Sequence, residues 1–383
     1  MKRIAVFGIM LCILATTFCA SGFQMTMASS EVQITSKSAF LMDYASGQIL
    51  YAKNEKEHLP VASMVKMMTI LLTLEEIDQG NLSLDDMITT SENASGMGGS
   101  QVFIDPYVEY RAEDLLKSVI VASANDASVA LAEHISGSEN AFVVKMNERA
   151  EELGMADTNY VNCTGLPAPE QYSCAKDSAL LLKQVAEHEL YHKYSTIWMD
   201  ELTHPSGRKT ELVNTNRLIR YYEGCDGGKT GSTNEAGCCL SASAKRKNMR
   251  LVSVVIGAKN SQTRFNECSS LFNYGFANFE SKNLLSQNEV AKEIAINKGK
   301  VSKASVYASE DFSVVGKKGE DGGYSVDYNL PSQINAPVKS GDVVGKAIVS
   351  KNGEVIKEVD LVMREDVQKL SFKDCLDHIT EKW

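Results

Sequence analysis

The sequence contains no cysteine or histidine pattern that is typical of a metal site or of a disulfide framework. Nine cysteines are present, two of them in the apolar N-terminal segment, and none forms a Cys-x-x-Cys pair. The other seven are an odd number, and Cys238 is adjacent to Cys239. This favours buried thiols that pack as small apolar side chains. His188 and His192 lie four residues apart, but no His-Glu-x-x-His pattern surrounds them, and we expect no metal.

An excess of positive charge is missing, and so is any long apolar run after the N-terminus. The net charge of −10 argues against nucleic acid as the main partner. The one apolar run, Ile4–Phe18, is short for a membrane span, follows two basic residues and precedes small residues near Gly22 and Ala28. This pattern predicts a signal peptide over residues 1–28, with an uncleaved anchor as the alternative.

The pattern of apolar residues changes near residue 281. The chain is long enough for two or three domains. Before residue 281, helical spacing alternates with strand patterns, and we assign residues 29–281 to a first domain. After it, short strand patterns with turns predict a small β-rich domain over 282–365. Residues 366–383 have roughly helical spacing and either form an amphipathic tail on a membrane surface, pack or fray. The expected late strands are 291–296, 304–308, 312–315, 324–328, 342–349 and 355–362.

The most informative stretch is Ser63-Met-Val-Lys66, at the start of a strongly helical segment. Residues three apart share a helix face, so the hydroxyl of Ser63 and the amine of Lys66 can point into one cleft. This geometry suits a serine nucleophile with a lysine base. Ser-x-x-Lys occurs three times in the chain, and Ser63 could simply cap the helix. The motif by itself is therefore weak evidence for catalysis.

Two further motifs follow in a specific order. Ser123-Ala-Asn125 falls on a predicted turn between two helices, and Lys229-Thr-Gly231 opens a predicted strand that is followed by a hairpin. Ser-x-Asn recurs often in the chain, whereas Lys-Thr-Gly occurs once. The three motifs, in this order and in these settings, are typical of penicillin-binding proteins and class A β-lactamases.

From about residue 32 to residue 365 the chain resembles the low-molecular-mass penicillin-binding proteins that are serine D-alanyl-D-alanine carboxypeptidases. The resemblance implies an α/β fold of the penicillin-binding-protein/β-lactamase-like transpeptidase type, a sheet flanked by helices plus a helical lobe, with a small C-terminal all-β domain. Neither Ser-Asp-Asn nor Glu-x-x-Leu-Asn of the class A β-lactamases occurs. Further segments that look like the carboxypeptidase family are 98–100, 158–162, 165–166, 172–177, 229–237 and Arg264, and 336–338 with Gly345 resemble its accessory domain.

The resemblance also implies roles for individual residues. Ser63 would be the nucleophile, Lys66 its base, and Ser123 the relay of a proton to the leaving amine. Asn125 would hold both Lys66 and the substrate amide. A free lysine titrates near 10.4, so Lys66 needs burial and a neighbouring cation, for which Lys229 is the candidate. The implied substrate-binding residues are Asn125, Lys229, Thr230, Gly231, Ser232 and Arg264, and the implied oxyanion donors are the backbone N–H groups of Ser63 and Ser232. Ser232 could instead be a backbone donor only, and Arg264 a surface helix residue.

The implied function is that of an exported, penicillin-sensitive serine-type D-Ala-D-Ala carboxypeptidase. It would remove the terminal D-alanine from peptidoglycan stem peptides, with a role in cell-wall biogenesis and cell shape. Its partners would be stem peptides ending in D-Ala-D-Ala and β-lactam antibiotics, and no cofactor is implied. We expect it outside the cytoplasm, either secreted or peripheral on the outer face of the cytoplasmic membrane. The alternatives are a β-lactamase of the same fold and a non-catalytic penicillin-binding wall protein.

Overall fold

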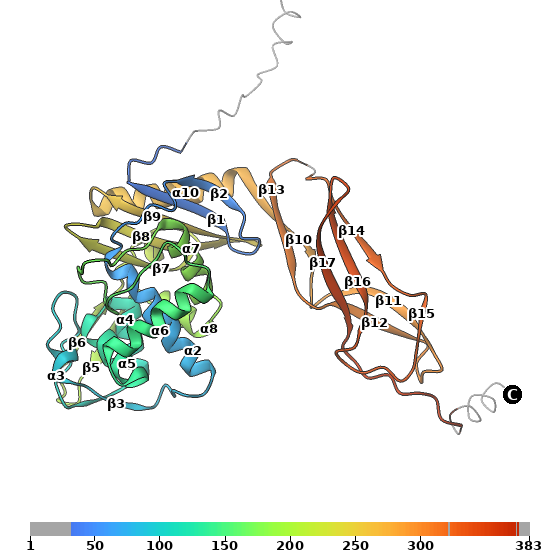
Figure 1. The fold of residues 1–383 in the computed structure, drawn as a ribbon, viewed down its shortest axis with the longest axis horizontal. Helices are drawn as coiled ribbons and strands as arrows, with labels where there is room; N and C mark the ends of the chain where they lie inside the picture. Colours follow the sequence, from blue (N-terminus) through green and yellow to red (C-terminus); the bar gives the residue numbers. More distant parts are fainter. Residues whose placement is uncertain (1–31, 321, 373, 375–383) are drawn as a thin grey trace, which may run out of the picture. The chain divides into compact units, whose positions relative to one another are not determined.

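The computed structural model describes residues 32–320, 322–372 and 374 (Figure 1). The expected signal peptide, 1–28, and most of the expected tail lie outside these residues. Within them the chain forms an α/β part and a β-rich part, and each contains its own cluster of buried apolar side chains. None of the helices in the described ranges combines the length and the apolar character needed to cross a bilayer.

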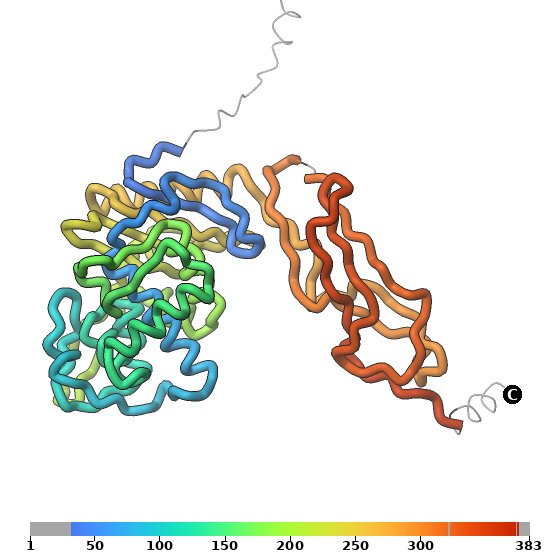
Figure 2. The backbone as a smooth tube through the Cα atoms, in the orientation of Figure 1, coloured from blue at the N-terminus to red at the C-terminus, as the bar shows by residue number. Residues whose placement is uncertain are grey.

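A five-stranded antiparallel sheet, ordered β2-β1-β9-β8-β7, organises the α/β part. β1 pairs with β9, so the N-terminal strands lie beside strands that come about two hundred residues later in the chain (Figure 2). β7 is the last strand in the order, so one side of it has no partner among the strands of residues 32–320, 322–372 and 374. The bounds are β1 Ser38–Asp43, β2 Ile49–Lys53, β7 Cys225–Thr233, β8 Gly237–Arg246 and β9 Met249–Ala258.

Helices cover both faces of this sheet. Residues 251–256 of β9 are all buried, which agrees with their nearly continuous apolar sequence. α7 (Ala175–Val185) and α10 (Ser261–Asn278) both contact β9, from opposite sides in Figure 1. α7 ends at Val185, and α8 (Glu189–Ser195) begins as a separate helix.

The helical lobe lies between β2 and β7 in the chain and surrounds one buried helix. α2 (Lys66–Asp78) buries its side chains from Lys66 to Leu74, against α4, α5, α6 and α7. A 3-10 turn, η1 (Ala62–Val65), precedes it, and Ser63 lies inside that turn without capping either helix. The other elements are β3 Met87–Thr89, α3 Glu92–Ser95, β4 Glu109–Arg111, α4 Ala112–Ala122, α5 Asn125–Ser136, α6 Glu139–Glu152 and α9 Leu218–Tyr221.

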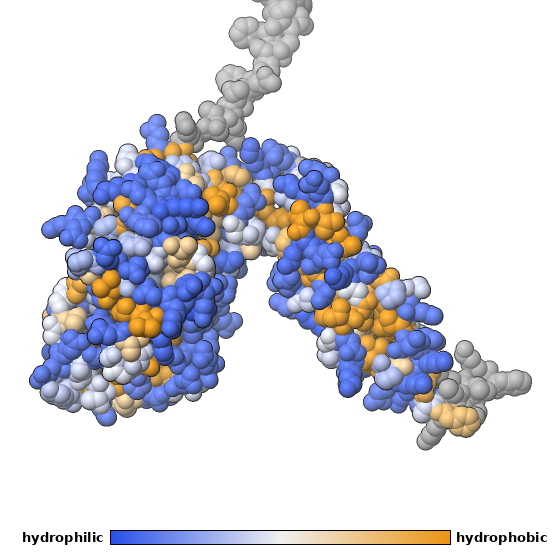
Figure 3. Space-filling view, viewed as in Figure 1, coloured by the Kyte–Doolittle hydropathy of each residue, from blue (hydrophilic) through white to orange (hydrophobic). Residues whose placement is uncertain are grey.

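A hairpin of the lobe was not predicted. β5 (Met199–Thr203) pairs with β6 (Lys209–Val213), where the sequence indicated only a polar stretch. Arg208 at its turn hydrogen-bonds the backbone oxygen of Phe103, so the hairpin contacts the loop after α3. In Figure 3 the visible face of the α/β part is mostly hydrophilic, with separate apolar areas.

The β-rich part has a six-stranded sheet, ordered β14-β16-β17-β12-β11-β15, and a two-stranded pair, β10–β13. The six expected strands correspond to β11–β14, β16 and β17. β10 follows α10 directly, and neither β10 nor β15 is among the expected strands. Val367 and Lys369 of the expected tail form β-bridges to Val338 and Gly299. The bounds are β10 Phe279–Leu285, β11 Val290–Asn297, β12 Lys303–Ala308, β13 Phe312–Lys317, β14 Tyr324–Asn329, β15 Gln333–Asn335, β16 Val343–Lys351 and β17 Glu354–Met363.

Candidate active site

The serine and the lysine of the first motif are in contact. The Nζ atom of Lys66 lies 3.0 Å from the Oγ atom of Ser63, in a hydrogen bond. The same Nζ donates to the backbone oxygen of Thr164 at 2.5 Å. The side chain of Lys66 is fully buried, at 0 % exposure, and no carboxylate in the described part of the chain pairs with it. A buried amine held by a hydroxyl and a carbonyl is poised to accept a proton from the hydroxyl.

Burial gives Lys66 the pKa that a base needs. It lowers the pKa of Lys66 to about 7, while Cys163 and Asp126 oppose the shift. Burial also lowers the pKa of Lys229 well below its usual value, with repulsion from Lys66 and Arg264 adding to the effect. We expected the Lys229 cation to help lower the pKa of Lys66. In the structure, desolvation lowers the pKa of Lys66, whereas the repulsion between the two amines lowers the pKa of Lys229.

The second and third motifs also meet. Lys229 Nζ donates to Ser123 Oγ at 2.7 Å and to the backbone oxygen of Thr230 at 3.2 Å. Ser123 occupies the break between α4 and α5 and has a left-handed backbone, with φ of 63°. For a residue with a side chain this conformation costs on the order of 1 kcal/mol or more and is found disproportionately at functional sites. The site thus contains two Lys–Ser pairs, and the lysine of each pair is fully buried.

A loop that the motifs do not include holds the first pair in place. The Oδ1 atom of Asn162 accepts hydrogen bonds from Thr164 N at 3.2 Å, Thr164 Oγ1 at 3.1 Å and Gly165 N at 2.7 Å. These bonds orient the Thr164 carbonyl toward Lys66. Gly165 has a φ of 78°, and a Cβ there would lie 2.0 Å from the oxygen of Ala62. The loop therefore packs directly on the turn that carries Ser63.

Asn125 does not hold Lys66 as expected. Its Nδ2 atom donates to the backbone oxygen of Gly98 at 2.6 Å, and its Oδ1 atom is buried without a partner among the described residues. The hydrogen bonds of Lys66 go to other groups. An unpartnered buried acceptor costs free energy unless a ligand supplies a donor, and a substrate amide N–H would do so.

Asp126 is a residue of the site that sequence reasoning missed. Its carboxylate is fully buried and accepts hydrogen bonds from the backbone N–H groups of Val102 and Ile104. It therefore ties the loop after α3 to the start of α5, beside Ser123 and Asn125. The signal was present in the sequence as an acid directly after the Ser-x-Asn motif, followed by the mainly apolar run 127–132.

The third motif lies on the edge strand β7 and faces the turn of Ser63. A Cβ at Gly231 would lie 2.3 Å from the oxygen of Val61 and 3.2 Å from the backbone nitrogen of Ser63. Glycine is needed here because the backbones of β7 and η1 approach so closely. Thr230 is 6 % exposed, whereas Ser232 is exposed and its Oγ atom contacts Cys238 Sγ at 3.7 Å.

Arg264 is not a surface residue. It is 8 % exposed, and its guanidinium donates to the backbone oxygens of Gly231 at 3.0 Å and Cys239 at 3.3 Å. Its Nε atom is buried without a partner in the described part of the chain. Arg264 therefore supports β7 from within the protein, with one donor left over.

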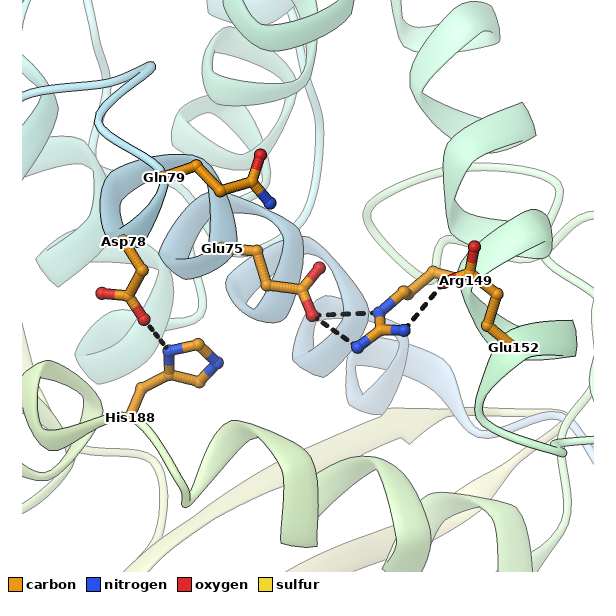
Figure 4. A pocket seen from close by; sticks show the side chains of 6 residues that line it. All are labelled: Glu75, Asp78, Gln79, Arg149, Glu152 and His188. Carbon is orange, nitrogen blue, oxygen red and sulfur yellow. Dashed lines mark hydrogen bonds and ion pairs between the residues drawn. The ribbon is translucent and has the colours of Figure 1, made fainter. Parts of the chain in front are cut away.

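A pocket of about 350 Å3 lies at the C-terminal end of α2, whereas Lys66 is at its N-terminal end (Figure 4). α2 has 13 residues, so this pocket is about 20 Å from Lys66. Its charged groups already pair with one another. Arg149 contacts Glu75 at 2.8 Å and Glu152 at 2.7 Å, and His188 contacts Asp78 at 2.6 Å. The pocket has neither a nucleophile nor a free charge, and we assign it no role in catalysis.

One group of potential metal ligands occurs among the described residues. The ligand-type atoms of Asp157, Cys174 and Asp177 lie within 4.8 Å of one another. Cys174 caps α7 by accepting from Asp177 N at 3.4 Å, and the Asp177 carboxylate accepts from Asp157 N at 2.9 Å and Thr158 Oγ1 at 2.8 Å. These hydrogen bonds explain the cluster as the cap of a helix, and it includes none of the predicted site residues.

The fold and the two Lys–Ser pairs define a serine peptidase with the penicillin-binding-protein fold. Residues 25–260 match the family model described as D-alanyl-D-alanine carboxypeptidase, and residues 279–369 match that of the penicillin-binding protein 5 C-terminal domain. The chain therefore belongs to the D-alanyl-D-alanine carboxypeptidase family. This confirms the family and the fold class that the motifs indicated.

Relatives match the chain over nearly its whole length. It is 40% identical to the D-alanyl-D-alanine carboxypeptidase DacF of Bacillus subtilis, over 100% of this chain and 99% of the relative. It is 34% identical to DacC of Escherichia coli, over 93% of this chain and 90% of the relative. The crystal structure of penicillin-binding protein 5 from Haemophilus influenzae superposes with a TM-score of 0.71 at 34% identity, over 89% of this chain and 99% of that one.

Proposed function

We propose that the protein is a serine-type D-Ala-D-Ala carboxypeptidase that removes the terminal D-alanine from peptidoglycan stem peptides through an acyl-enzyme on Ser63. The observation that carries this proposal is the hydrogen bond of 3.0 Å between the buried amine of Lys66 and the hydroxyl of Ser63, together with the Lys229–Ser123 bond of 2.7 Å. Membership of the D-alanyl-D-alanine carboxypeptidase family supports the same reaction. The absence of class A β-lactamase motifs makes the lactamase the weaker alternative.

Acylation begins with the transfer of a proton from Ser63 to neutral Lys66. The Oγ atom of Ser63 then attacks the carbonyl carbon of the penultimate D-alanine and forms a tetrahedral intermediate. The backbone N–H groups of Ser63 and Ser232 stabilise its oxyanion, and each such donor contributes about 3 kcal/mol at the transition state. The close approach of Gly231 to the Ser63 turn brings β7 next to the nucleophile.

Departure of the terminal D-alanine requires a proton on its amine. Ser123 donates its hydroxyl proton to this amine and takes up the proton that Lys66 received from Ser63, so that Lys66 is neutral again, while Lys229 donates a hydrogen bond to the Ser123 oxygen. Collapse of the intermediate breaks the amide bond and leaves an ester on Ser63. Water then attacks this ester with Lys66 as the base, which releases the shortened peptide and regenerates Ser63.

We propose that the substrate binds to polar side chains of the site, two of which, Asn125 and Arg264, have a buried atom without a hydrogen-bond partner among the described residues. Thr230 and Ser232 lie two residues apart on β7, so their side chains share one face of the strand, where they hold the terminal carboxylate together with Arg264, which also bonds the backbone oxygen of Gly231 between them. The free Oδ1 atom of Asn125 accepts the amide N–H of the substrate. A β-lactam presents the same carboxylate and a strained amide, so it should acylate Ser63 as well.

The substrate class also bears on location and domain organisation. Peptidoglycan lies outside the cytoplasm, so we propose export by the segment at 1–28. The protein is then either secreted or peripheral on the outer face of the cytoplasmic membrane, where the tail after residue 365 could make contact. We propose that residues 29–281 form the catalytic domain and residues 282–365 an accessory β-rich domain.

Intact-mass spectrometry of the protein with and without benzylpenicillin tests the nucleophile, with Ser63→Ala as control. We expect one persistent penicilloyl adduct on the wild type and none on Ser63→Ala. In parallel, release of D-alanine from a diacetyl-Lys-D-Ala-D-Ala peptide tests the reaction. A folded wild type that forms no adduct would contradict the mechanism, and rapid penicillin hydrolysis without an adduct would indicate the β-lactamase. An adduct without any D-alanine release would indicate the non-catalytic binding protein.

A further inference from the structure

Residues 98–105 form a loop that holds Asn125 at the active site. The Nδ2 atom of Asn125 donates to Gly98 O at 2.6 Å, and its backbone N–H donates to Ser100 O at 2.7 Å. The carboxylate of the next residue, Asp126, accepts hydrogen bonds from two further N–H groups of the loop. The orientation of the Asn125 side chain therefore depends on the position of this loop.

The loop has a strained backbone at Phe103. This residue has a φ of 61°, in the left-handed region, and its side chain is 57 % exposed. A bulky residue adopts this conformation only where surrounding contacts hold it, and strain of this kind is found disproportionately at functional sites. Because more than half of the side chain is exposed, its own packing does not supply these contacts. Groups outside the loop must therefore hold its backbone.

The turn of the hairpin β5–β6 supplies such groups. Arg208 donates to the backbone oxygen of Phe103 and lies 3.4 Å from the Asp105 carboxylate. His204 is 2 % exposed, and its Nδ1 atom lies 2.9 Å from the hydroxyl oxygen of Tyr110, which in turn accepts from Asp105 N at 3.0 Å. Arg208 thus bonds the loop directly and His204 bonds it through Tyr110. We call these bonds the hairpin contact.

The hairpin contact requires a neutral imidazole. The Nη2 atom of Arg208 lies 3.1 Å from Nδ1 of His204, and arginine can only donate, so Nδ1 is an unprotonated acceptor. The ring proton is then on Nε2, which donates to Thr210 Oγ1 at 2.9 Å. A second proton would turn Nδ1 into a donor, remove an acceptor from Arg208 and place two cations side by side.

The groups that face His204 keep it neutral near pH 7. Burial lowers its pKa below the ordinary value and the Arg208 guanidinium adds to this effect, whereas the carboxylates of Asp105 and Asp126 oppose it. Burial raises the pKa of Tyr110, which therefore stays uncharged. His204 is thus neutral above its ordinary pKa of about 6.5, and it gains its second proton only on the acid side of that value.

We propose that Arg208 and His204 are positioning residues for substrate binding, because they hold the loop 98–105 where it fixes the Asn125 side chain, and that a proton on His204 breaks this contact. The inference rests on the proposed carboxypeptidase function, in which Asn125 accepts the substrate amide. Both residues act through Asn125 and not through Lys66. They should therefore change the affinity of the first complex with substrate or penicillin more than the rate of acylation.

Saturation kinetics with benzylpenicillin separate the dissociation constant of this first complex from the acylation rate constant. In Arg208→Ala we expect the dissociation constant at pH 8 to rise about fivefold, the size of one lost hydrogen bond. The acylation rate constant should change less than about twofold, because the lost interaction is made equally in the ground state. The ratio of the two dissociation constants, variant over wild type, should fall toward one between pH 8 and pH 5. Titration of Lys66 and Lys229 affects both proteins alike and cancels in the ratio.

Lys209→Ala is the matched control. Lys209 follows Arg208 in the same hairpin and pairs with Glu201 at 2.7 Å, so its replacement removes the same charge without touching the loop. This variant should bind benzylpenicillin as the wild type does at every pH. The Arg208 side chain is itself 40 % exposed, so its loss should leave the fold intact, which thermal melting at each pH establishes.

Two further variants test the proton and the path. In His204→Asn an amide oxygen replaces Nδ1 as the acceptor but cannot be protonated. Against this variant, the ratio for Arg208→Ala should keep its pH 8 value down to pH 5. In an Asn125→Ala background, Arg208→Ala should cause no further loss of affinity, because the two residues act in one series. If His204→Asn does not fold, the pH dependence of Arg208→Ala against the wild type decides.

An unchanged dissociation constant in Arg208→Ala, a ratio that does not vary with pH, or an equal loss in Lys209→Ala would overturn the proposal. Release of D-alanine from diacetyl-Lys-D-Ala-D-Ala, measured on the same proteins, judges the carboxypeptidase function separately. If the wild type releases none but the penicillin ratio behaves as expected, the hairpin contact stands and the function fails. If the wild type releases D-alanine and the ratio is one at pH 8, the function stands and the positioning role fails.

Discussion

At the scale of single residues, the reactivity of Ser63 depends on the protonation state of Lys66. Burial lowers the pKa of Lys66 to about 7, so the amine is mostly charged below pH 7 and mostly neutral above it. We expect the rate of acylation by benzylpenicillin to rise about tenfold per pH unit below pH 7 and to level off above about pH 8. Quenched-flow mass spectrometry between pH 5 and pH 9 measures this profile. A rate that does not change between pH 5 and pH 9 would show that Lys66 is not the base, and a rate that still rises tenfold per unit at pH 9 would show that burial does not lower its pKa.

The Thr164 carbonyl that holds Lys66 depends on Asn162. Asn162→Ala removes the acceptor of three hydrogen bonds in the loop. We expect acylation to slow about tenfold, because a loosened carbonyl no longer orients the base. Pre-steady-state kinetics should show that non-covalent penicillin affinity changes little. Asn162→Asp keeps the acceptor and should recover most of the rate above pH 8, with its midpoint shifted upward by the added negative charge. If Asn162 only maintained the fold of the loop, the pH midpoint of acylation would not shift in Asn162→Asp.

The sequence predicted the side chains of this site better than its backbone groups. Ser63, Lys66, Ser123 and Lys229 could be found because their side chains carry the chemistry and stand in recognisable motifs. The carbonyl of Thr164 could not be found, because every residue has one and only the folded loop decides which points at an amine. The expected bond between Asn125 and Lys66 failed for the same reason, since the loop at Gly98 takes the amide donor.

At the scale of elements, catalysis requires that β7 and the turn η1 lie in contact. In Gly231→Ala the new Cβ would meet the oxygen of Val61 at 2.3 Å, so the strand and the turn must separate. This displaces the oxyanion donors of Ser63 and Ser232, and we expect acylation to fall by about a hundredfold. Gly98→Ala is the control, because a Cβ there meets nothing within 4 Å. The measurement is the acylation rate beside the melting temperature, and equal losses in both variants would contradict the argument.

The elements that sequence reasoning missed share one property, which is that few of their side chains are buried. In the hairpin β5–β6 only Leu202 and Leu212 are buried, so no alternation of apolar and polar residues marks either strand. β10 buries only its two ends, Phe279 and Leu285, and it follows α10 without a break. Such strands form because another strand is available to pair with them. The local sequence of a strand does not show whether such a partner is present.

At the scale of the whole molecule, the two parts were predictable because the type of periodicity changes between them. Apolar residues recur at helical spacing in much of the chain before residue 281, and they alternate with polar residues in short strands after it. This change indicates two parts with different architectures. The largest apolar core of the α/β part includes no residue after Ile256, and the core of the β-rich part includes none before Leu285. Two cores that share no residue can form independently of each other.

A chain that ends at Asn278 tests this independence. It keeps α10, the whole five-stranded sheet and every residue proposed for catalysis, and it removes β10 together with its partner β13. We expect this fragment to be acylated by benzylpenicillin within about twofold of the full chain, because additivity holds for distant sites that share no contacts. Ser63→Ala in the fragment is the control for specific labelling. A folded fragment with a much slower rate would mean that the β-rich part supports the active site, and a fragment that fails to fold would mean that the two cores depend on each other.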